Sequence, residues 1–156
     1  AVVKLLSILK GDRFRSKLVT AMAFGNINKA FEPVKTSKDW LTRDVKVAEK
    51  YLEDPNCGFL FTLNGYRTLF RSMYLAQDMD QLQKMDEDLP VLFISGEMDP
   101  VGDFGKGVKK AVNAFYTSGM ENVECILYPE ARHELVNELN REEVFQDVLE
   151  WLEFHI

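Results

Sequence analysis

Long apolar runs, cysteine and an excess of basic charge are what this sequence has little of. No stretch approaches the roughly 18 consecutive apolar residues that a membrane-spanning helix needs, so we expect no membrane span. Lys and Arg number 19 against 25 Asp and Glu, and a net charge of −6 argues against binding to nucleic acid. Residues 1–11 are apolar but lack a basic leader and a small-residue cleavage site, so no signal peptide is expected.

The two cysteines, Cys57 and Cys125, form no C-x-x-C and have no nearby histidine, so the sequence predicts no zinc site. Isolated cysteines in a domain of 156 residues are usually reduced core residues, and we expect this state in preference to a disulfide. Reduced cysteines favour a cytoplasmic protein. The hydrophobic share of 46% and the charged share of 28% are those of one ordinary globular domain.

Before Pro90 the chain carries helical signals almost throughout. Apolar residues recur at helical spacing, and turn-forming residues separate these stretches. We expect helices over residues 2–9, 13–24, 44–53 and 63–77. The first helix has so wide an apolar face that it must cover another part of the protein.

After Pro90 the pattern changes to strands that alternate with helices. VLFIS (91–95) is a continuous β-branched and aromatic run, which predicts a strand buried on both faces. VECILY (123–128) predicts a second strand. We expect helices over 104–118 and 141–155.

This order of elements predicts a parallel pair of strands with a right-handed crossover. Parallel strands occur in sheets that are covered on both faces, and two strands make almost no such sheet. Residues 1–88 offer no good candidates for more strands. We therefore expect the sheet to be completed by strands upstream of Ala1 or by another chain.

Asp99 and His133 follow the two predicted strands and form a candidate catalytic pair. Asp99 lies four residues past the strand end at 95, and His133 lies five past the end at 128. Parallel neighbours about 4.8 Å apart would bring both loops to one edge, with carboxylate and imidazole within hydrogen-bonding reach. A carboxylate bound to the Nδ1–H of histidine fixes its tautomer and stabilises the imidazolium formed during proton transfer.

Other candidate residues have simpler interpretations. Asp103 is the rival acid, and we assign it to the N-cap of the helix that follows it. His155 lies on the last turn of a helix, where a cation is favoured. Gly102, Gly105 and Gly107 form G-x-x-G-x-G, which is neither a dinucleotide fingerprint nor a P-loop, so we attribute them to loop flexibility and close backbone approach. No cofactor or metal is implied.

Two motifs together resemble α/β-hydrolases of the lysophospholipase and monoacylglycerol lipase group, which is also described as serine aminopeptidase-like. They are SGEMDPVGDFGKGV (95–108) and YPEARHELVNE (128–138). DWLTRD (39–44), YLEDPNCGFLFT (51–62) and REEVFQDVLEWLE (141–153) extend the resemblance from about 36 to 153. The resemblance implies an α/β fold, with an α/β-hydrolase-type parallel sheet and a helical cap. It also implies Asp99 as the triad acid and His133 as the general base.

The serine nucleophile of that family lies in G-x-S-x-G, at a turn between a strand and a helix, and no such motif occurs here. Ser7, Ser95 and Ser118 lack the glycines and that setting. The oxyanion hole would use the N–H after the serine, so it is missing too. We interpret the chain as the cap and C-terminal half of a serine hydrolase, inactive alone, whose serine lies upstream.

Three parts follow from this interpretation. We expect a helical cap segment over 1–35, a helical connection over 36–89, and a C-terminal α/β core over 90–156. The substrates implied by the resemblance are carboxylic esters such as lysophospholipids or monoacylglycerols, and the sequence identifies no substrate-binding residue. We interpret most Phe and Met side chains of 14–85 as core packing rather than as an acyl-chain pocket. The alternative function is a non-catalytic binding or interaction protein of the same fold. An upstream G-x-S-x-G would support the enzyme, and its absence would support this alternative.

Overall fold

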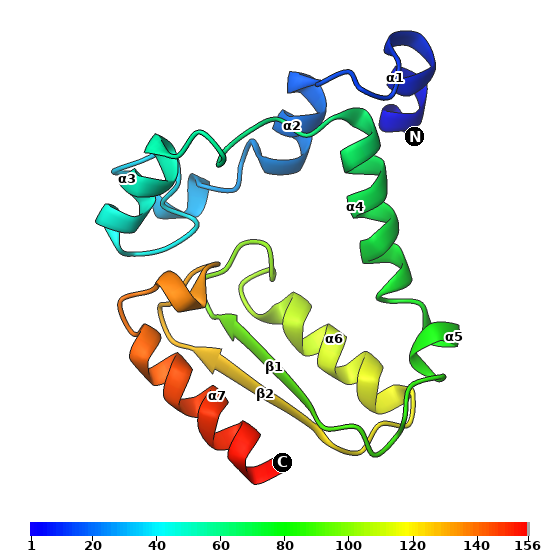
Figure 1. Ribbon diagram of the computed structural model, residues 1–156, viewed down its shortest axis with the longest axis vertical. Coiled ribbons are helices and arrows are strands. Elements are labelled where there is room, and N and C mark those ends of the chain that lie inside the picture. Colours follow the sequence, from blue (N-terminus) through cyan, green and yellow to red (C-terminus); the bar gives the residue numbers. More distant parts are fainter. Residues whose placement is uncertain (156) are drawn as a thin grey trace.

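Helices occupy the first half of the chain, and a two-stranded sheet with two long helices occupies the second (Figure 1). The computed structural model describes residues 1–155. The elements are α1 (Val2–Lys10), α2 (Lys17–Phe24), η1 (Lys29–Phe31), α3 (Val45–Glu53), α4 (Leu63–Leu75), α5 (Met79–Leu82), β1 (Val91–Gly96), α6 (Lys106–Thr117), β2 (Val123–Tyr128), η2 (Leu135–Asn137) and α7 (Arg141–His155). This confirms the predicted α/β class and the change of pattern near Pro90.

β1 and β2 are parallel, with Val91 opposite Val123 and Gly96 opposite Tyr128. α6 forms the crossover between them, as the order of elements predicted. In this register both carboxyl ends finish at the same level, next to the loops that carry the candidate residues.

α6 and α7 lie on opposite sides of the sheet (Figure 1). The ring of Phe93 in β1 meets that of Phe115 in α6 edge to face, with centroids 4.9 Å apart. On the other face, Ile126 and Tyr128 of β2 pack near Val144 of α7 in the core cluster. Because side chains alternate along each strand, the sheet presents apolar side chains to the helices on both of its faces.

β1 departs from the prediction of a strand buried on both faces. Within residues 1–155 it pairs with β2 alone, so its other edge has no strand beside it. The side chain of Ile94 consequently stays 36% exposed. The prediction assumed a wider sheet than the described residues contain.

Asp103 is not the N-cap of α6, and that assignment is wrong. The helix begins after Gly105, which has a φ of 78° and occupies the N-cap position. Asp103 and Phe104 also have positive φ values, 50° and 53°, so the backbone passes through the left-handed region before the helix starts. The turn therefore delays the helix and leaves Asp103 exposed.

The cysteines are free, as expected, but neither is a core residue. Cys125 is exposed and Cys57 is half-buried. Cys125 lies in the middle of β2, which is an edge strand of the sheet formed by residues 1–155. The prediction of core cysteines is wrong because Cys125 lies on this edge strand and Cys57 lies in the turn after α3.

Side-chain caps start α2, α3 and α4. Ser16 accepts from the N–H of Val19 at the start of α2, and Thr62 does the same for α4 through the N–H of Gly65. Asp44 accepts from the N–H groups of Lys46 and Val47 at the start of α3. These caps satisfy backbone donors that have no partner within the helix.

α1, α2 and α4 share a small apolar core. Val19, Leu63 and Tyr66 are buried there, and Val3, Leu6 and Phe24 pack against them. The opposite side of α1 is open, since Leu5, Ile8 and Leu9 are 59%, 73% and 67% exposed. The wide apolar face of this helix is thus covered only in part within the described chain.

None of the helices in residues 1–155 combines the length and the apolar character that crossing a bilayer would require.

Candidate active site

Asp99 and His133 meet at the carboxyl end of the sheet. The Nδ1 atom of His133 lies 3.0 Å from Oδ2 of Asp99. The parallel register sets the ends of β1 and β2 side by side, and each residue follows its strand by a few positions. The expected proximity is therefore observed, while the catalytic roles of the two residues stay predictions.

The carboxylate of Asp99 is buried and both of its oxygens have a partner. Oδ1 accepts from the N–H of Val101 at 2.8 Å, and Oδ2 faces His133. The backbone is fixed as well, because the carbonyl of Asp99 accepts from the N–H of Phe104 at 2.9 Å. These contacts aim the carboxylate at the imidazole.

The hydrogen bond from the Asp99 carboxylate raises the pKa of His133, because it favours the imidazolium. Burial opposes this rise, and the charge of Glu134 adds to it. With Nδ1 bound to Asp99, Nε2 is the nitrogen that can exchange a proton with another group. The side chain of His133 is 37% exposed, so such a group can reach it.

Residues 39–43, which we call the strap, run along the loop that carries His133. The N–H of His133 points to the carbonyl of Trp40 at 3.4 Å, and the N–H of Glu134 donates to that of Leu41 at 2.8 Å. The indole of Trp40 lies against the imidazole, with ring centroids 5.1 Å apart and planes inclined by 40°. His133 is thus held between a carboxylate and an aromatic ring.

The first residue of the strap has its own anchor. Burial raises the pKa of Asp39, but hydrogen bonds from Thr36 and Lys35 and the charge of Arg132 outweigh it, so the pKa lies below its ordinary value. Asp39 therefore stays ionised and keeps the start of the strap tied to the preceding turn.

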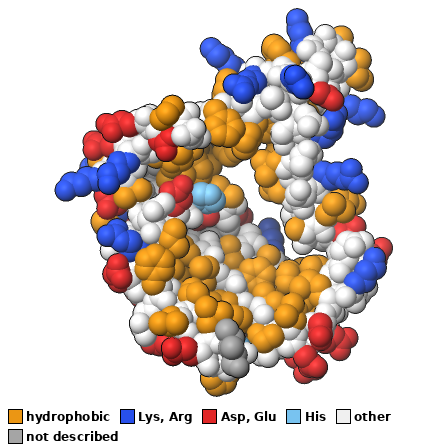
Figure 2. Space-filling model, in the orientation of Figure 1, with side chains coloured by type: hydrophobic (Ala, Val, Ile, Leu, Met, Phe, Trp, Pro, Cys, Tyr) orange, Lys and Arg blue, Asp and Glu red, His pale blue; other side chains and the backbone are white. Residues whose placement is uncertain are grey.

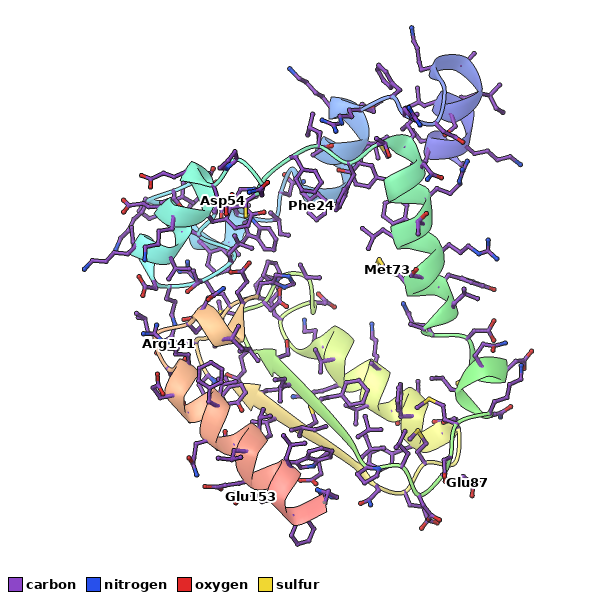
Figure 3. All side chains as sticks on the ribbon, in the orientation of Figure 1. Phe24, Asp54, Met73, Glu87, Arg141 and Glu153 are labelled. Carbon is purple, nitrogen blue, oxygen red and sulfur yellow. The ribbon has the colours of Figure 1, made fainter. Side chains whose placement is uncertain are left out.

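A cavity of about 1080 Å³ opens beside His133. Its lining is mainly apolar and comes from α2, α4, the strap and the loop after β1; it includes Met22, Phe24, Ile27, Leu69, Phe70 and Met73. Phe24 and Met73 point toward the space between α2 and α4 (Figure 3), and hydrophobic side chains gather around the same hollow (Figure 2). Some of the Phe and Met side chains that we interpreted as core packing, namely Met22, Phe24, Phe70 and Met73, thus line this cavity.

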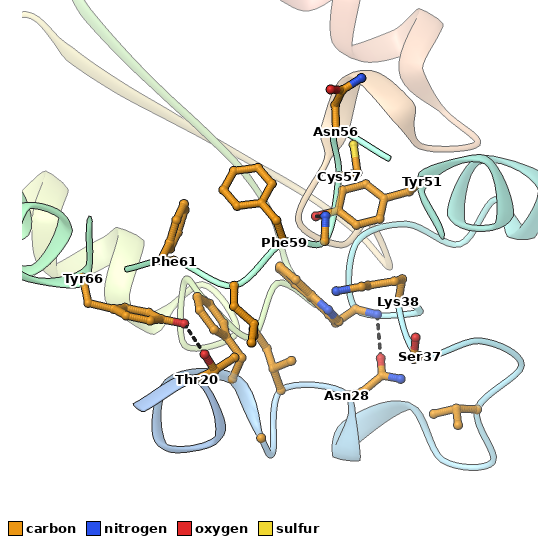
Figure 4. A pocket seen from close by; sticks show the side chains of 17 residues that line it. Thr20, Asn28, Ser37, Lys38, Tyr51, Asn56, Cys57, Phe59, Phe61 and Tyr66 are labelled. Atoms are coloured by element: carbon orange, nitrogen blue, oxygen red, sulfur yellow. Dashed lines mark hydrogen bonds between the residues drawn. The ribbon is translucent and has the colours of Figure 1, made fainter. Parts of the chain in front are cut away.

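A second cavity of about 620 Å³ shares Phe24, Ile27 and Trp40 with the first (Figure 4). At one end the hydroxyls of Thr20 and Tyr66 are hydrogen-bonded at 2.8 Å. The rings of Phe24 and Trp40, which stack with centroids 6.4 Å apart, line both cavities.

The remaining candidates have partners other than the side chains of Asp99 and His133. His155 is bonded through Nδ1 to the carbonyl of Trp151 at 2.8 Å, at the far end of α7. Ser95 is buried, and its hydroxyl points at the carbonyl of Gly96 at 3.4 Å. A Cβ on Gly107 would lie 2.9 Å from the carbonyl oxygen of Gly102, which agrees with close backbone approach as the reason for these glycines.

In the part of the chain that the structure describes, no three side chains of His, Cys, Asp or Glu are grouped to hold a metal ion. Sequence reasoning missed the contact of Trp40 with His133. The only signal for it is DWLTRD (39–44), which we used for the resemblance and not for the site.

Comparisons with known proteins place this geometry in context. Residues 2–140 match the family described as serine aminopeptidase, S33. None of the curated proteins is similar enough in sequence to count as a match.

Several solved structures share the fold. A thermostable carboxyl esterase from Bacillus coagulans, in complex with glycerol, superposes with a TM-score of 0.87 at 24% identity, over 97% of this chain and 50% of that one. A lipase in an open form gives a TM-score of 0.75 at 23% identity, over 95% and 48% of the two chains. A monoacylglycerol lipase from Paleococcus ferrophilus gives 0.64 at 19%, over 92% and 54%. The chain therefore spans about half the length of these structures, and at such identities the likeness shows the fold alone.

Proposed function

The chain belongs to the serine aminopeptidase, S33, family, and from this premise we propose that Asp99 and His133 are the acid and the base of an ester-hydrolysing catalytic triad. The observation that carries the proposal is the 3.0 Å contact between the two side chains, beside a largely apolar cavity. A buried carboxylate on Nδ1 and an accessible Nε2 are what a general base of this kind requires.

In the proposed reaction a serine hydroxyl attacks the carbonyl carbon of the ester, and Nε2 of His133 takes the hydroxyl proton. The tetrahedral intermediate collapses, the C–O bond to the alcohol breaks, and His133 gives its proton to the leaving oxygen. Water then attacks the acyl-enzyme with His133 again as the base, which releases the acid and restores the serine. Asp99 holds the tautomer and stabilises the imidazolium throughout.

The serine comes, in this proposal, from a segment outside residues 1–156. The sequence has no G-x-S-x-G, and β1 has no strand on its outer edge within residues 1–155. That segment would also supply the oxyanion donors and the strands that complete the sheet. Residues 1–35 then act as a cap segment, 36–89 as the connection and 90–156 as the core. We refer to the combination as the whole protein.

The substrate we propose is a small or lipid-like carboxylic ester, such as a monoacylglycerol or a lysophospholipid. The cavity beside His133 has a volume large enough to hold an acyl chain, and the side chains that line it are mainly apolar. Carboxyl esterase and monoacylglycerol lipase are the activities named for two of the similar structures. The two free cysteines fit a cytoplasmic location, which is part of the same proposal.

The test is hydrolysis of 4-nitrophenyl butyrate and of a monoacylglycerol by the whole protein. His133→Ala should lower kcat by roughly three orders of magnitude or more, because a triad acts as a unit. His155→Ala is the matched control and should leave kcat unchanged, since His155 lies at the far end of α7. Residues 1–156 alone should show no turnover.

A His133→Ala variant with near-normal kcat would remove His133 from the proposed role. A whole protein that carries no G-x-S-x-G and hydrolyses no ester would instead support the alternative, a non-catalytic binding protein of this fold.

A further inference from the structure

Glu138 is a fully buried carboxylate between the strap and the loop that carries His133, with a side-chain exposure of 0%. Its Oε1 accepts from the backbone N–H of Arg43 at 3.0 Å and from that of Arg132 at 2.9 Å. Its Oε2 accepts from Nε of Arg43 at 2.9 Å and from the N–H of Leu139 at 3.1 Å. Each oxygen of this carboxylate thereby accepts two hydrogen bonds, as a buried charge requires.

The position of these donors matters more than their number. Arg132 directly precedes His133, and Arg43 ends the strap that carries Trp40. Because one carboxylate oxygen binds the backbone of both residues, Glu138 sets the separation between the strap and the histidine loop. This separation places the imidazole against the indole.

Three further hydrogen bonds cross the same boundary. The guanidinium of Arg132 donates to the carbonyls of Asp39 and Thr42, and the hydroxyl of Thr42 donates to the carbonyl of Asn137 at 2.8 Å. They surround Glu138 and leave it at the centre of the contact. Among the hydrogen bonds of residues 1–155, none connects the strap to the loop that carries Asp99.

We propose that Glu138 is a positioning residue for His133, which holds the strap against the histidine loop and so keeps the imidazole at bonding distance from Asp99. The expected effect of Glu138 on turnover rests on the proposed function. Its expected effect on the contact between Asp99 and His133 does not. Glu138 acts through backbone N–H groups and touches no reacting atom, so its loss should affect the alignment of the base rather than the binding of substrate.

The decisive variant is Glu138→Gln in the whole protein. The amide has the same size, but its NH₂ group would face N–H donors and leave them unpaired. We expect kcat to fall by about 10- to 100-fold with KM within about threefold, as for a base displaced by a fraction of an ångström. We also expect the pKa of His133, read from its imidazole NMR signal, to fall toward the unperturbed value of about 6.5, because the contact with Asp99 loosens.

The control is Glu130→Gln. Glu130 pairs with the same Arg43, at 3.3 Å, but its side chain is 84% exposed. Removal of this charge should leave kcat and the His133 titration unchanged. The spectrum of a His133→Gln variant assigns the signal.

Arg43→Lys decides the question if Glu138→Gln does not fold. It keeps the charge and the backbone N–H but loses the planar donor that meets Oε2, so we expect changes in the same direction. A folded variant of either kind with an unchanged kcat and an unchanged His133 titration would overturn the proposal and make Glu138 a structural residue only. If the whole protein shows no His133-dependent turnover, the proposed function fails, and the titration still decides the role of Glu138.

Discussion

Gly96, the last residue of β1, has no room for a side chain. A Cβ at this position would lie 2.2 Å from the carbonyl oxygen of Ala131 and 2.3 Å from that of Arg132, whereas ordinary contacts begin at 3.4 Å. Both oxygens belong to backbone, which cannot rotate away as a flexible side chain can. Gly96→Ala must therefore push the end of β1 and the histidine loop apart by roughly 1 Å.

Such a displacement has a cost in stability. The N–H groups of Glu97 and Met98 donate across this boundary to the carbonyls of Tyr128 and Ala131, both at 2.9 Å. Overpacking costs about 1–3 kcal/mol, and each lost hydrogen bond adds about 1 kcal/mol. We expect the free energy of unfolding to fall by about 3–5 kcal/mol.

The same displacement breaks the contact between Asp99 and His133, which now spans 3.0 Å. A misplacement of about 1 Å at a reacting group lowers the rate by roughly 100-fold, so kcat should fall by this factor or more. Urea unfolding and ester hydrolysis by the whole protein measure the two effects.

Gly65→Ala is the matched control for the added methyl group. Gly65 lies in the first turn of α4, and a Cβ there would meet nothing closer than 3.4 Å. Because alanine favours a helix over glycine, the free energy of unfolding should stay the same or rise by up to about 1 kcal/mol, with kcat unchanged. Our reasoning is refuted if Gly96→Ala behaves like this control.

Asp99→Asn should lower the pKa of His133, since the carboxylate that raises it is gone, and should cut kcat by several orders of magnitude. Because the base must be neutral, kcat/KM rises with pH through the pKa of His133, and this limb should move to lower pH in the variant; a limb that stays in place would contradict the pairing. Leu63→Ala empties a fully buried position and should lower the free energy of unfolding by about 2–5 kcal/mol. Leu5→Ala, at a side chain 59% exposed, should change it by less than about 0.5 kcal/mol, and equal losses would be incompatible with the packing of α1.

The strands and the placement of Asp99 and His133 could be predicted from the sequence because local patterns encode them. A continuous apolar run marks β1, and VECILY (123–128) marks β2 at the bounds that the structure has. The crossover then requires parallel pairing, which brings the two following loops together. The family resemblance is confirmed, while the catalytic roles stay predictions.

The strap and the turn before α6 could not be predicted, because both depend on tertiary contacts. The backbone of Asp103 adopts a positive φ that no local signal demands of an aspartate. Glu138 is buried against residues 95 positions away in the sequence. Periodicity carries no information about such a distant partner.

The long separation between the strap and the histidine loop also bears on the order in which the protein assembles. β1, α6, β2 and α7 are consecutive. The pairing of Val91 with Val123 closes a loop of 32 positions, whereas the bond between Thr42 and Asn137 closes one of 95 positions. Closing so long a loop costs about 4 kcal/mol of chain entropy. The contiguous unit can therefore form first, and the strap docks afterwards.

On unfolding, the sequence of events runs in reverse. The amide of Glu134, which is bonded to the strap, should exchange with solvent through an opening that leaves the β1–β2 ladder intact. In mild denaturant His133 then loses its alignment with Asp99 while the β1–β2 pairing is still intact. Topology thus makes the strap the part that separates first from the histidine loop.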